Sequence, residues 1–224
     1  MFVGHIAVSL AAKRAAPRTS LGTLVAAAVW IDLVWPVLLL AGVERVRIDP
    51  GNTPFTPLDF ESYPFTHSGV AVLLWSAAFG AAYLARTGYR RGAAVVAALV
   101  ASHWVLDAIS HRPDLPLLWR GPMVGLGLWY SVPATLAVEL ALFAAGVVVY
   151  ARSTQARDAV GRWALAGLVA FLVATYLGSA FGAPPPSVTA IAVGGLAMQS
   201  AIVAWAAWVD RHRRAVAPEL LLQG

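Results

Sequence analysis

Residues 92–109 read GAAVVAALVASHWVLDAI, an apolar run that contains only two ionisable side chains, those of His103 and Asp107. Arg90 and Arg91 precede the run directly. A helix needs about 20 mainly apolar residues to cross the hydrocarbon core of a bilayer, and this run approaches that length. We therefore expect a membrane-spanning helix here that carries two ionisable groups.

Further apolar runs of similar length lie on both sides of this one, each closed by charged residues, proline or glycine. They are Leu21–Gly42, Phe65–Ala85, Val124–Tyr150, Trp163–Phe181 and Val188–Val209. A shorter segment, Phe2–Ala16, precedes them and predicts a half-span or re-entrant helix covered by protein. The expected fold is all-α: a polytopic transmembrane helical bundle of about six spans plus this N-terminal segment, in one membrane-embedded domain over residues 1–224.

Composition excludes most other classes of protein. The chain has 224 residues, of which 59% are hydrophobic and 12% charged, where soluble domains carry roughly 25% charged residues. There is no cysteine, so the chain offers no disulfide, thiolate ligand or cysteine nucleophile. The net charge is +5, but the basic residues cluster between the apolar runs, where they set topology; we expect no nucleic-acid partner.

The distribution of basic residues predicts the orientation. Placing the stretch before Leu21 in the cytoplasm leaves only Arg45, Arg47, Arg112 and Arg120 outside. The other twelve are then cytoplasmic: Lys13, Arg14, Arg18, Arg86, Arg90, Arg91, Arg152, Arg157, Arg162, Arg211, Arg213 and Arg214. The C-terminal tail is expected in the cytoplasm and the longest loop, residues 43–64, outside.

Ionisable residues inside apolar runs are the candidates for function, because each is costly in hydrocarbon unless it is paired or coordinated. His103, Asp107 and His111 are spaced by four residues, so they share one face of a helix. A histidine and a carboxylate at this spacing can close on one cation, by the logic of helical zinc motifs. The alternative is a hydrogen-bonded pair that joins two helices, and the spacing alone leaves both open.

Depth along the helices predicts that these groups converge. At about 1.5 Å of rise per residue, Asp32 lies near mid-membrane and His103 slightly beyond it. Asp107, His111 and His67 follow toward the outer surface, and His5 reaches the same depth if its segment enters from the cytoplasmic side. We expect one cavity that opens outward.

The donor types indicate the metal. Imidazoles with carboxylates suit zinc, and also manganese, iron or nickel, better than calcium or magnesium. The number of candidate ligands suggests one or two ions. Glu139 has three open roles: ligand, general base, or partner of the Ser131 or Thr135 hydroxyl. Ser68 is expected to be a helix cap or a helix-packing hydroxyl rather than a nucleophile, and Thr66 and Asp59 are expected to be loop residues.

These motifs resemble the family of predicted inner-membrane, LexA-regulated, metal-dependent hydrolases. The likeness covers about residues 1–119, the half expected to hold the metal, and leaves residues 120–224 as further spans and tail. Its elements are Gly4-His5, Asp32, Phe65-Thr66-His67-Ser68, Ser102-His103-x-x-x-Asp107 and Pro113 to Leu118. The resemblance implies a multi-pass protein of a bacterial-type inner membrane. Leu33 and Val34 stand where that family often has a second acid.

The ligand order is also similar, more distantly, to that of the zinc-dependent phospholipase C and single-strand nuclease superfamily, which is all-helical and soluble. Its last ligands are a histidine and a glutamate one turn apart. Glu139 matches the glutamate, whereas Thr135 stands in place of the histidine.

The leading interpretation is a membrane-embedded metal hydrolase, in which bound zinc lowers the pKa of a water toward about 7. The expected metal ligands and proton-transfer residues follow from it: His67, His103 and Asp107 as core ligands, Asp32 and His5 completing the metal site, and His111 or Glu139 moving protons. A site in the outer half of the membrane suggests a lipid or lipid-linked substrate, for instance a phosphoester. The alternatives are a metal-ion or proton transporter and a scaffold with a structural metal.

Overall fold

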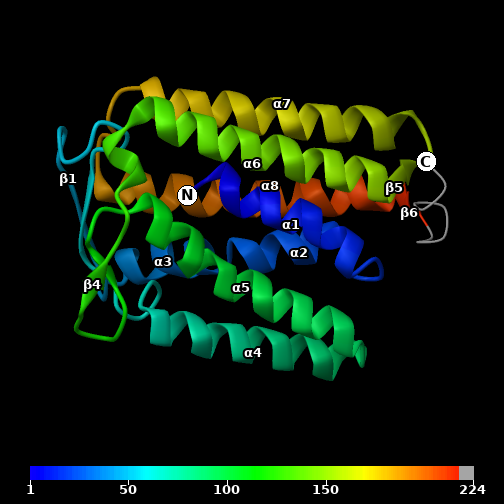
Figure 1. Ribbon diagram of the computed structural model, residues 1–224, viewed down its shortest axis with the longest axis horizontal. Helices are drawn as coiled ribbons and strands as arrows, with labels where there is room; N and C mark the ends of the chain where they lie inside the picture. Colours follow the sequence, from blue (N-terminus) through cyan, green and yellow to red (C-terminus); the bar gives the residue numbers. More distant parts are fainter. Residues whose placement is uncertain (217–224) are drawn as a thin grey trace.

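The computed structural model describes residues 1–216, which form a bundle of roughly aligned helices (Figure 1). The helices are α1 (Val3–Ala15), α2 (Leu21–Ala28), α3 (Trp30–Leu40), α4 (Gly69–Thr87), α5 (Arg90–Ser110), α6 (Val132–Ser153), α7 (Ala159–Phe181) and α8 (Val188–Arg211). A short 3₁₀ helix, η1 (Leu128–Tyr130), precedes α6. The end of the tail, residues 217–224, lies outside the described residues.

Short antiparallel strand pairs close the two ends of the bundle. At one end β1 (Arg45–Ile48) pairs with β2 (Leu58–Ser62), and β3 (Leu115–Pro116) with β4 (Met123–Val124). At the other end β5 (Thr154–Ala156) pairs with β6 (Arg213–Ala215), as Figure 1 shows. The long loop over residues 43–64 is therefore largely a hairpin, and Asp59 lies in a strand rather than in the expected loop.

The expected all-α polytopic bundle is confirmed. Helices α4, α5, α6, α7 and α8 are each long and apolar enough to cross a membrane. Together α2 and α3 pass the same test as a sixth span, but they are bent by 54° at Val29. The first span is thus broken, where the sequence predicted one continuous helix over Leu21–Gly42.

Two helices, α4 and α6, begin later in the chain than the sequence predicts. Helix α4 begins at Gly69 rather than Phe65, because the Ser68 hydroxyl caps it by accepting the backbone N–H of Ala71. Helix α6 begins at Val132 rather than Val124, since the intervening residues form β4 and η1. Gly127 has a φ of 73°, which stops a helix from running through this segment.

Helix α1 lies inside the bundle, packed chiefly against α6 and α2, as a half-span must be. Ala7 and Leu10 face the apolar core, and His5, Ser9 and Lys13 are buried as well. Gly146 of α6 permits the approach: a Cβ at this position would stand 2.4 Å from the carbonyl oxygen of Ala7. The absence of a side chain at one residue therefore sets the depth to which α1 enters the bundle.

Buried charges at the β5–β6 end are paired. Lys13 Nζ donates to Asp210 Oδ2 at 2.8 Å and to the carbonyl of Thr19 at 2.9 Å. The Tyr150 hydroxyl donates to Asp210 Oδ1 at 3.3 Å. This cluster joins α1, α6 and α8, so that each buried charge has a partner.

The close approach of α1 to α6 predicts the effect of two glycine substitutions. Gly146→Ala should destabilise the protein by about 1–3 kcal/mol, because the new methyl group collides with the backbone of α1. Gly178→Ala on α7 is the matched control, since a Cβ there meets nothing within 4 Å. Thermal unfolding in detergent measures both. Equal melting temperatures for the two variants would contradict this account of the interface.

Candidate metal centre

Five side chains from four segments meet at the end of the bundle that carries β1 to β4. His5 comes from α1, Asp32 from α3, His67 from the turn before α4, and His103 and Asp107 from α5. The sequence predicted all of them as ligands, and the structure brings them together in two overlapping groups. These are His5, His103 and Asp107, and Asp32, His67 and His103.

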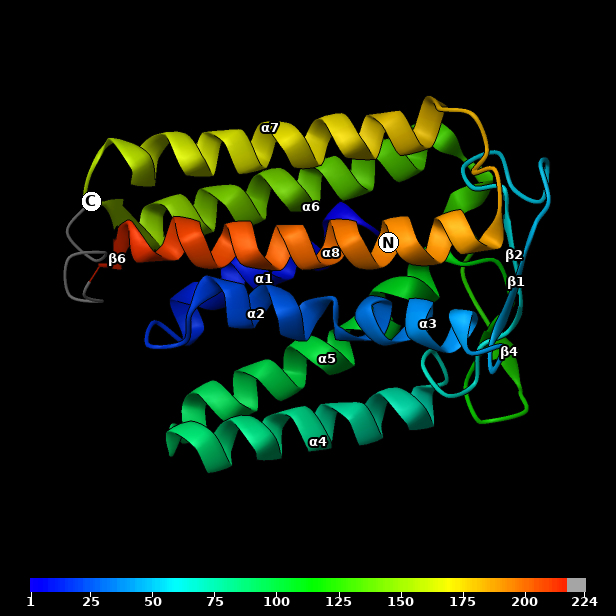
Figure 2. The ribbon, with the colours of Figure 1, turned by 180° about the vertical axis from the view of Figure 1, so that it is seen from behind.

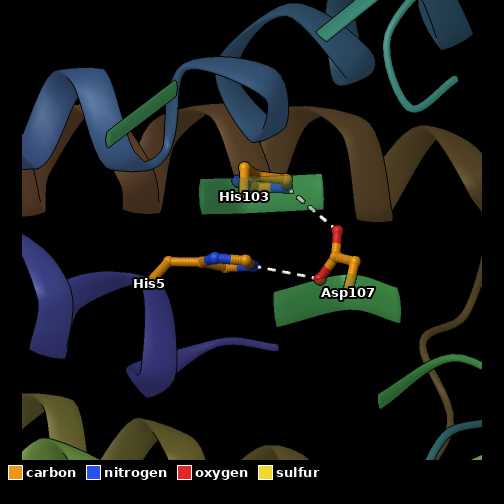
Figure 3. Close-up of side chains that lie close together, drawn as sticks. All are labelled: His5, His103 and Asp107. Carbon is orange, nitrogen blue, oxygen red and sulfur yellow. Dashed lines mark hydrogen bonds and ion pairs between the residues drawn. The ribbon is translucent and has the colours of Figure 1, made fainter. Parts of the chain in front are cut away.

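The first group is organised around the Asp107 carboxylate (Figure 3). Its Oδ1 lies 3.1 Å from His5 Nε2, and its Oδ2 lies 3.1 Å from His103 Nε2. The two imidazole rings are stacked with centroids 3.8 Å apart and planes 4° from parallel. All three side chains are buried. The four-residue spacing thus places His103 and Asp107 on one face of α5, as expected.

The second group adds Asp32 and His67. Asp32 Oδ1 lies 3.6 Å from His103 Nε2 and 3.8 Å from His67 Nε2, and His67 Nε2 lies 3.9 Å from Asp107 Oδ2. In a tetrahedral site with zinc–nitrogen bonds of 2.0–2.1 Å, ligand atoms are about 3.3 Å apart. The observed separations exceed this value by about 0.3–0.6 Å, so these atoms can close on an ion with small movements.

The proton of the His103 ring is fixed by the break between α2 and α3. Its Nδ1 lies 2.9 Å from the carbonyl oxygen of Ala28, immediately before the break. A carbonyl can only accept, so Nδ1 carries the hydrogen and the neutral ring presents a lone pair at Nε2. That Nε2 is buried and makes no hydrogen bond among residues 1–216.

A buried carboxylate fixes the proton of His67 in the same way. The Thr66 hydroxyl lies 2.7 Å from Glu44 Oε2 and 2.7 Å from His67 Nδ1. Its single hydrogen goes to the carboxylate, which can only accept, so His67 Nδ1 must donate to the hydroxyl oxygen. Glu44 is itself held by the backbone N–H groups of Phe65 and Thr66, at 2.8 and 2.9 Å. The lone pair of His67 therefore lies at Nε2, facing Asp32 and Asp107.

When both imidazoles are neutral, their Nε2 lone pairs are directed toward carboxylate oxygens. Acceptors that face one another in a buried space repel, and a cation between them removes the repulsion. The Met1 amino group, 2.5 Å from Asp107 Oδ1, is one positive group beside three carboxylates, those of Asp32, Asp107 and Glu139. The donor set and the charge balance both fit a divalent cation.

A cavity of about 180 Å³ adjoins the cluster. Asp32, His67 and Asp107 form part of its wall, and the side chain of Asp32 is 25% exposed. The opposite wall is aromatic and includes Trp35, Phe55, Phe60 and Trp129. An ion held by these ligands would therefore border an open space rather than a closed shell of protein.

Ion pairs fasten the β1–β2 hairpin over this cavity. Asp59 of β2 accepts from Arg47 of β1 at 2.6 Å and also from Arg112, which follows α5. Arg112 Nε donates in turn to Asp114 at 2.9 Å, and the Asp114 carboxylate raises the pKa of the guanidinium. The hairpin is thus tied to the end of the helix that carries His103 and Asp107.

His111 lines the cavity but belongs to neither ligand group. Its Nδ1 lies 3.0 Å from Asp114 Oδ1, so Nδ1 donates to that carboxylate and Nε2 is left to accept a proton. Burial lowers the pKa of His111, against the opposing effect of Asp114, and favours the neutral ring. Burial also raises the pKa of the neighbouring Tyr63, whose hydroxyl donates to the Asp114 carbonyl at 3.1 Å.

Glu139 is buried and lines the same cavity. Its Oε2 accepts the backbone N–H of Phe2 at 2.8 Å and that of Gly4 at 3.2 Å, which holds the start of α1. Its Oε1 has no hydrogen-bond partner within the described part of the chain. The Thr135 hydroxyl donates instead to the carbonyls of Leu128 and Ser131, so Glu139 is not its partner.

The sequence did not single out Glu44 or Asp114. Both lie outside the apolar runs, where an acid is unremarkable, and only the fold brings Glu44 to Thr66 and Asp114 to His111. Thr66 lies in a turn, as expected, but it also joins Glu44 to His67. In the sequence, the one indication of this role was that Thr66 directly precedes the candidate ligand His67.

No family model, curated protein or solved structure matches this chain.

Glu44→Gln should reverse the proton on His67. The two backbone N–H groups retain the amide oxygen, so the new NH₂ faces Thr66, whose hydroxyl then donates to His67 Nδ1 and moves the hydrogen of the ring to Nε2. We expect zinc affinity to fall by about 10- to 100-fold, the usual effect of losing a group that orients a ligand. Competition with a chelating dye measures it.

Matched variants separate this effect from loss of folding. Thr66→Val removes the same connection and should weaken zinc binding similarly, whereas Thr66→Ser keeps the hydroxyl and should bind normally. Glu61→Gln changes a half-exposed acid on β2 and serves as the control. Normal affinity in both Glu44→Gln and Thr66→Val would exclude the relay.

Proposed function

We propose that this protein is a membrane-embedded, metal-dependent hydrolase that acts on a lipid or lipid-linked substrate. One observation carries the proposal: the Nε2 lone pairs of His67 and His103 face the carboxylates of Asp32 and Asp107 at the edge of an open cavity. The resemblance of the first half to inner-membrane metal-dependent hydrolases agrees with this interpretation.

Zinc is the ion that these donors suit best, with manganese, iron or nickel as the other choices. His67, His103, Asp32 and Asp107 would hold one ion. His5 contacts Asp107 Oδ1, the carboxylate oxygen that does not face His103, and would complete a second metal site there. When bound, the ion would supply a Lewis acid that makes a water more acidic and polarises a phosphoryl or acyl oxygen.

The chain supplies acceptors for the proton of the attacking water. Glu139 and His111 both line the cavity. Within residues 1–216, neither Glu139 Oε1 nor His111 Nε2 makes a hydrogen bond, so each can accept a proton. In phosphoester hydrolysis the water oxygen bonds to phosphorus, the ester P–O bond breaks, and the alcohol leaves. The proton taken from water by Glu139 or His111 returns to that alcohol, so that charge and atoms balance.

The cavity favours a small head group attached to a larger apolar molecule. Its volume corresponds to roughly six water molecules, enough for a phosphate and a short alcohol but not for acyl chains. Aromatic walls and the surrounding spans suit a substrate whose chains stay in the lipid. The excess of basic residues at the opposite end of the bundle supports the proposal that this cavity lies in the outer half of the membrane and the C-terminal tail in the cytoplasm.

Transport of a metal ion or protons is the alternative. His5 and Ser9 lie one turn apart on α1, in the direction of Lys13. However, the Ser9 hydroxyl donates to the carbonyl of Ile6, and Lys13 is paired with Asp210. Within residues 1–216 no chain of hydrogen bonds joins the cluster to the arginine-rich end, which favours hydrolysis.

Elemental analysis tests the metal. Detergent-purified protein should carry about one or two equivalents of zinc or a related ion, and His103→Ala with Asp107→Ala should lose it. His212→Asn is the matched control, because His212 pairs with Asp158 at the other end of the bundle. If none of these proteins bound metal after incubation with zinc, the hydrolase proposal would fall and the cluster would be a proton relay or a helix contact.

Glu139→Gln tests the acid–base role. Hydrolysis of lipid phosphoesters by the zinc-loaded protein should fall by about 10²- to 10⁴-fold, while zinc content stays constant because Glu139 belongs to neither ligand group. Glu61→Gln should leave the rate unchanged. Unchanged hydrolysis in Glu139→Gln would assign proton transfer to His111, and zinc flux into liposomes without hydrolysis would favour a transporter.

A further inference from the structure

A second recess, distinct from the cavity beside the metal cluster, is lined by residues of α2, α3 and α4, which are labelled in Figure 2. Helix α4 packs against α5 and diverges from α2 and α3, which leaves a groove of about 600 Å³. Its deep end is lined by Trp30, Trp75 and Phe79, and its other end by Tyr83, Arg86 and Thr87. The groove is therefore apolar inside and basic at its mouth.

The dimensions of the groove suit an acyl chain. Along α4 it extends from Trp75 to Thr87, about 18 Å at 1.5 Å per residue, which is close to the thickness of one leaflet. A volume of 600 Å³ over this length gives a mean cross-section of about 33 Å².

A neighbouring groove offers room for a second chain. It has a volume of about 530 Å³ and lies between α2 and α8, with Ala204 and Ala207 on its far wall. The two grooves share Thr23, Trp30 and Phe79, which form the ridge between them. Two apolar grooves on either side of one ridge match a lipid with two acyl chains.

The polar end carries positive charge that the protein does not neutralise. Arg14, Arg18, Arg86, Arg90 and Arg91 lie where α1, α4 and α5 end or begin. Among residues 1–216 none of them has a carboxylate within 4 Å, and the acids at this end, Asp158 and Asp210, are paired with His212 and Lys13. A phosphate at Arg86 would meet an uncompensated cation.

We propose that these two grooves bind one anionic phospholipid, with its phosphate at Arg86 and its acyl chains on either side of the ridge. This lipid lies in the leaflet opposite the metal cavity, so it is a bound component rather than the substrate. The charge at the mouth favours it over a zwitterionic lipid, and the experiments below separate it from a helix of a second copy.

Native mass spectrometry of protein released from nanodiscs tests the site. The nanodiscs contain phosphatidylglycerol and phosphatidylcholine in equal amounts with identical acyl chains. The wild-type protein should retain phosphatidylglycerol preferentially, and Arg86→Gln should reduce the ratio of retained phosphatidylglycerol to phosphatidylcholine by about fivefold, the effect of one basic residue near an anionic lipid. Arg152→Gln is the control, an exposed arginine at the same end on α6.

Ala82→Trp fills the groove with a side chain and should abolish retention of both lipids without changing zinc content. Phosphatidylglycerol with brominated chains should quench tryptophan fluorescence less in Trp75→Phe, because Trp75 lines the groove. An identical lipid ratio in Arg86→Gln and Arg152→Gln would overturn the proposal. So would a dimer that Ala82→Trp dissociates, since a second copy would then be the occupant. Zinc content and hydrolysis report separately on the metal site.

Discussion

The site depends on one electrostatic conflict: the Nε2 atoms of two imidazoles, which carry lone pairs when the rings are neutral, lie against carboxylate oxygens inside a membrane bundle. Because His103 Nδ1 is committed to the Ala28 carbonyl and His67 Nδ1 to the Thr66 hydroxyl, neither neutral ring can donate to the facing acids. A cation between the groups relieves it, and this requirement underlies the metal-dependent chemistry proposed above.

Irregular elements of the fold make that arrangement possible. The 54° bend at Val29 accompanies the contact between the Ala28 carbonyl and His103, which a straight span would have kept inside its own helix. Helix α1 brings His5 to the opposite side of Asp107 because Gly146 allows it to sink into the bundle. The functional groups therefore lie where regular spanning helices stop being regular, as in other membrane proteins that bind ions.

The sequence predicted the helices and the five clustered residues well, because both follow from periodicity and from the cost of charge in lipid. It predicted the starts of α4 and α6 too early, since these starts depend on the Ser68 cap and on the backbone of Gly127. It missed the bend at Val29, which accompanies a tertiary contact between the Ala28 carbonyl and His103. Glu44 and Asp114 could not be found in the same way. They lie in polar segments, and their partners, Thr66 and His111, are brought to them only by the folded hairpins.

Helix α1 also constrains how the protein is assembled. Its 13 residues extend about 20 Å, short of the roughly 30 Å hydrocarbon core, so it cannot be stably inserted as an independent span. It must enter after α5 and α6 have formed the space that receives it. His5 is consequently the last of the five clustered side chains to arrive, and the cluster is completed only after α6 has entered the membrane.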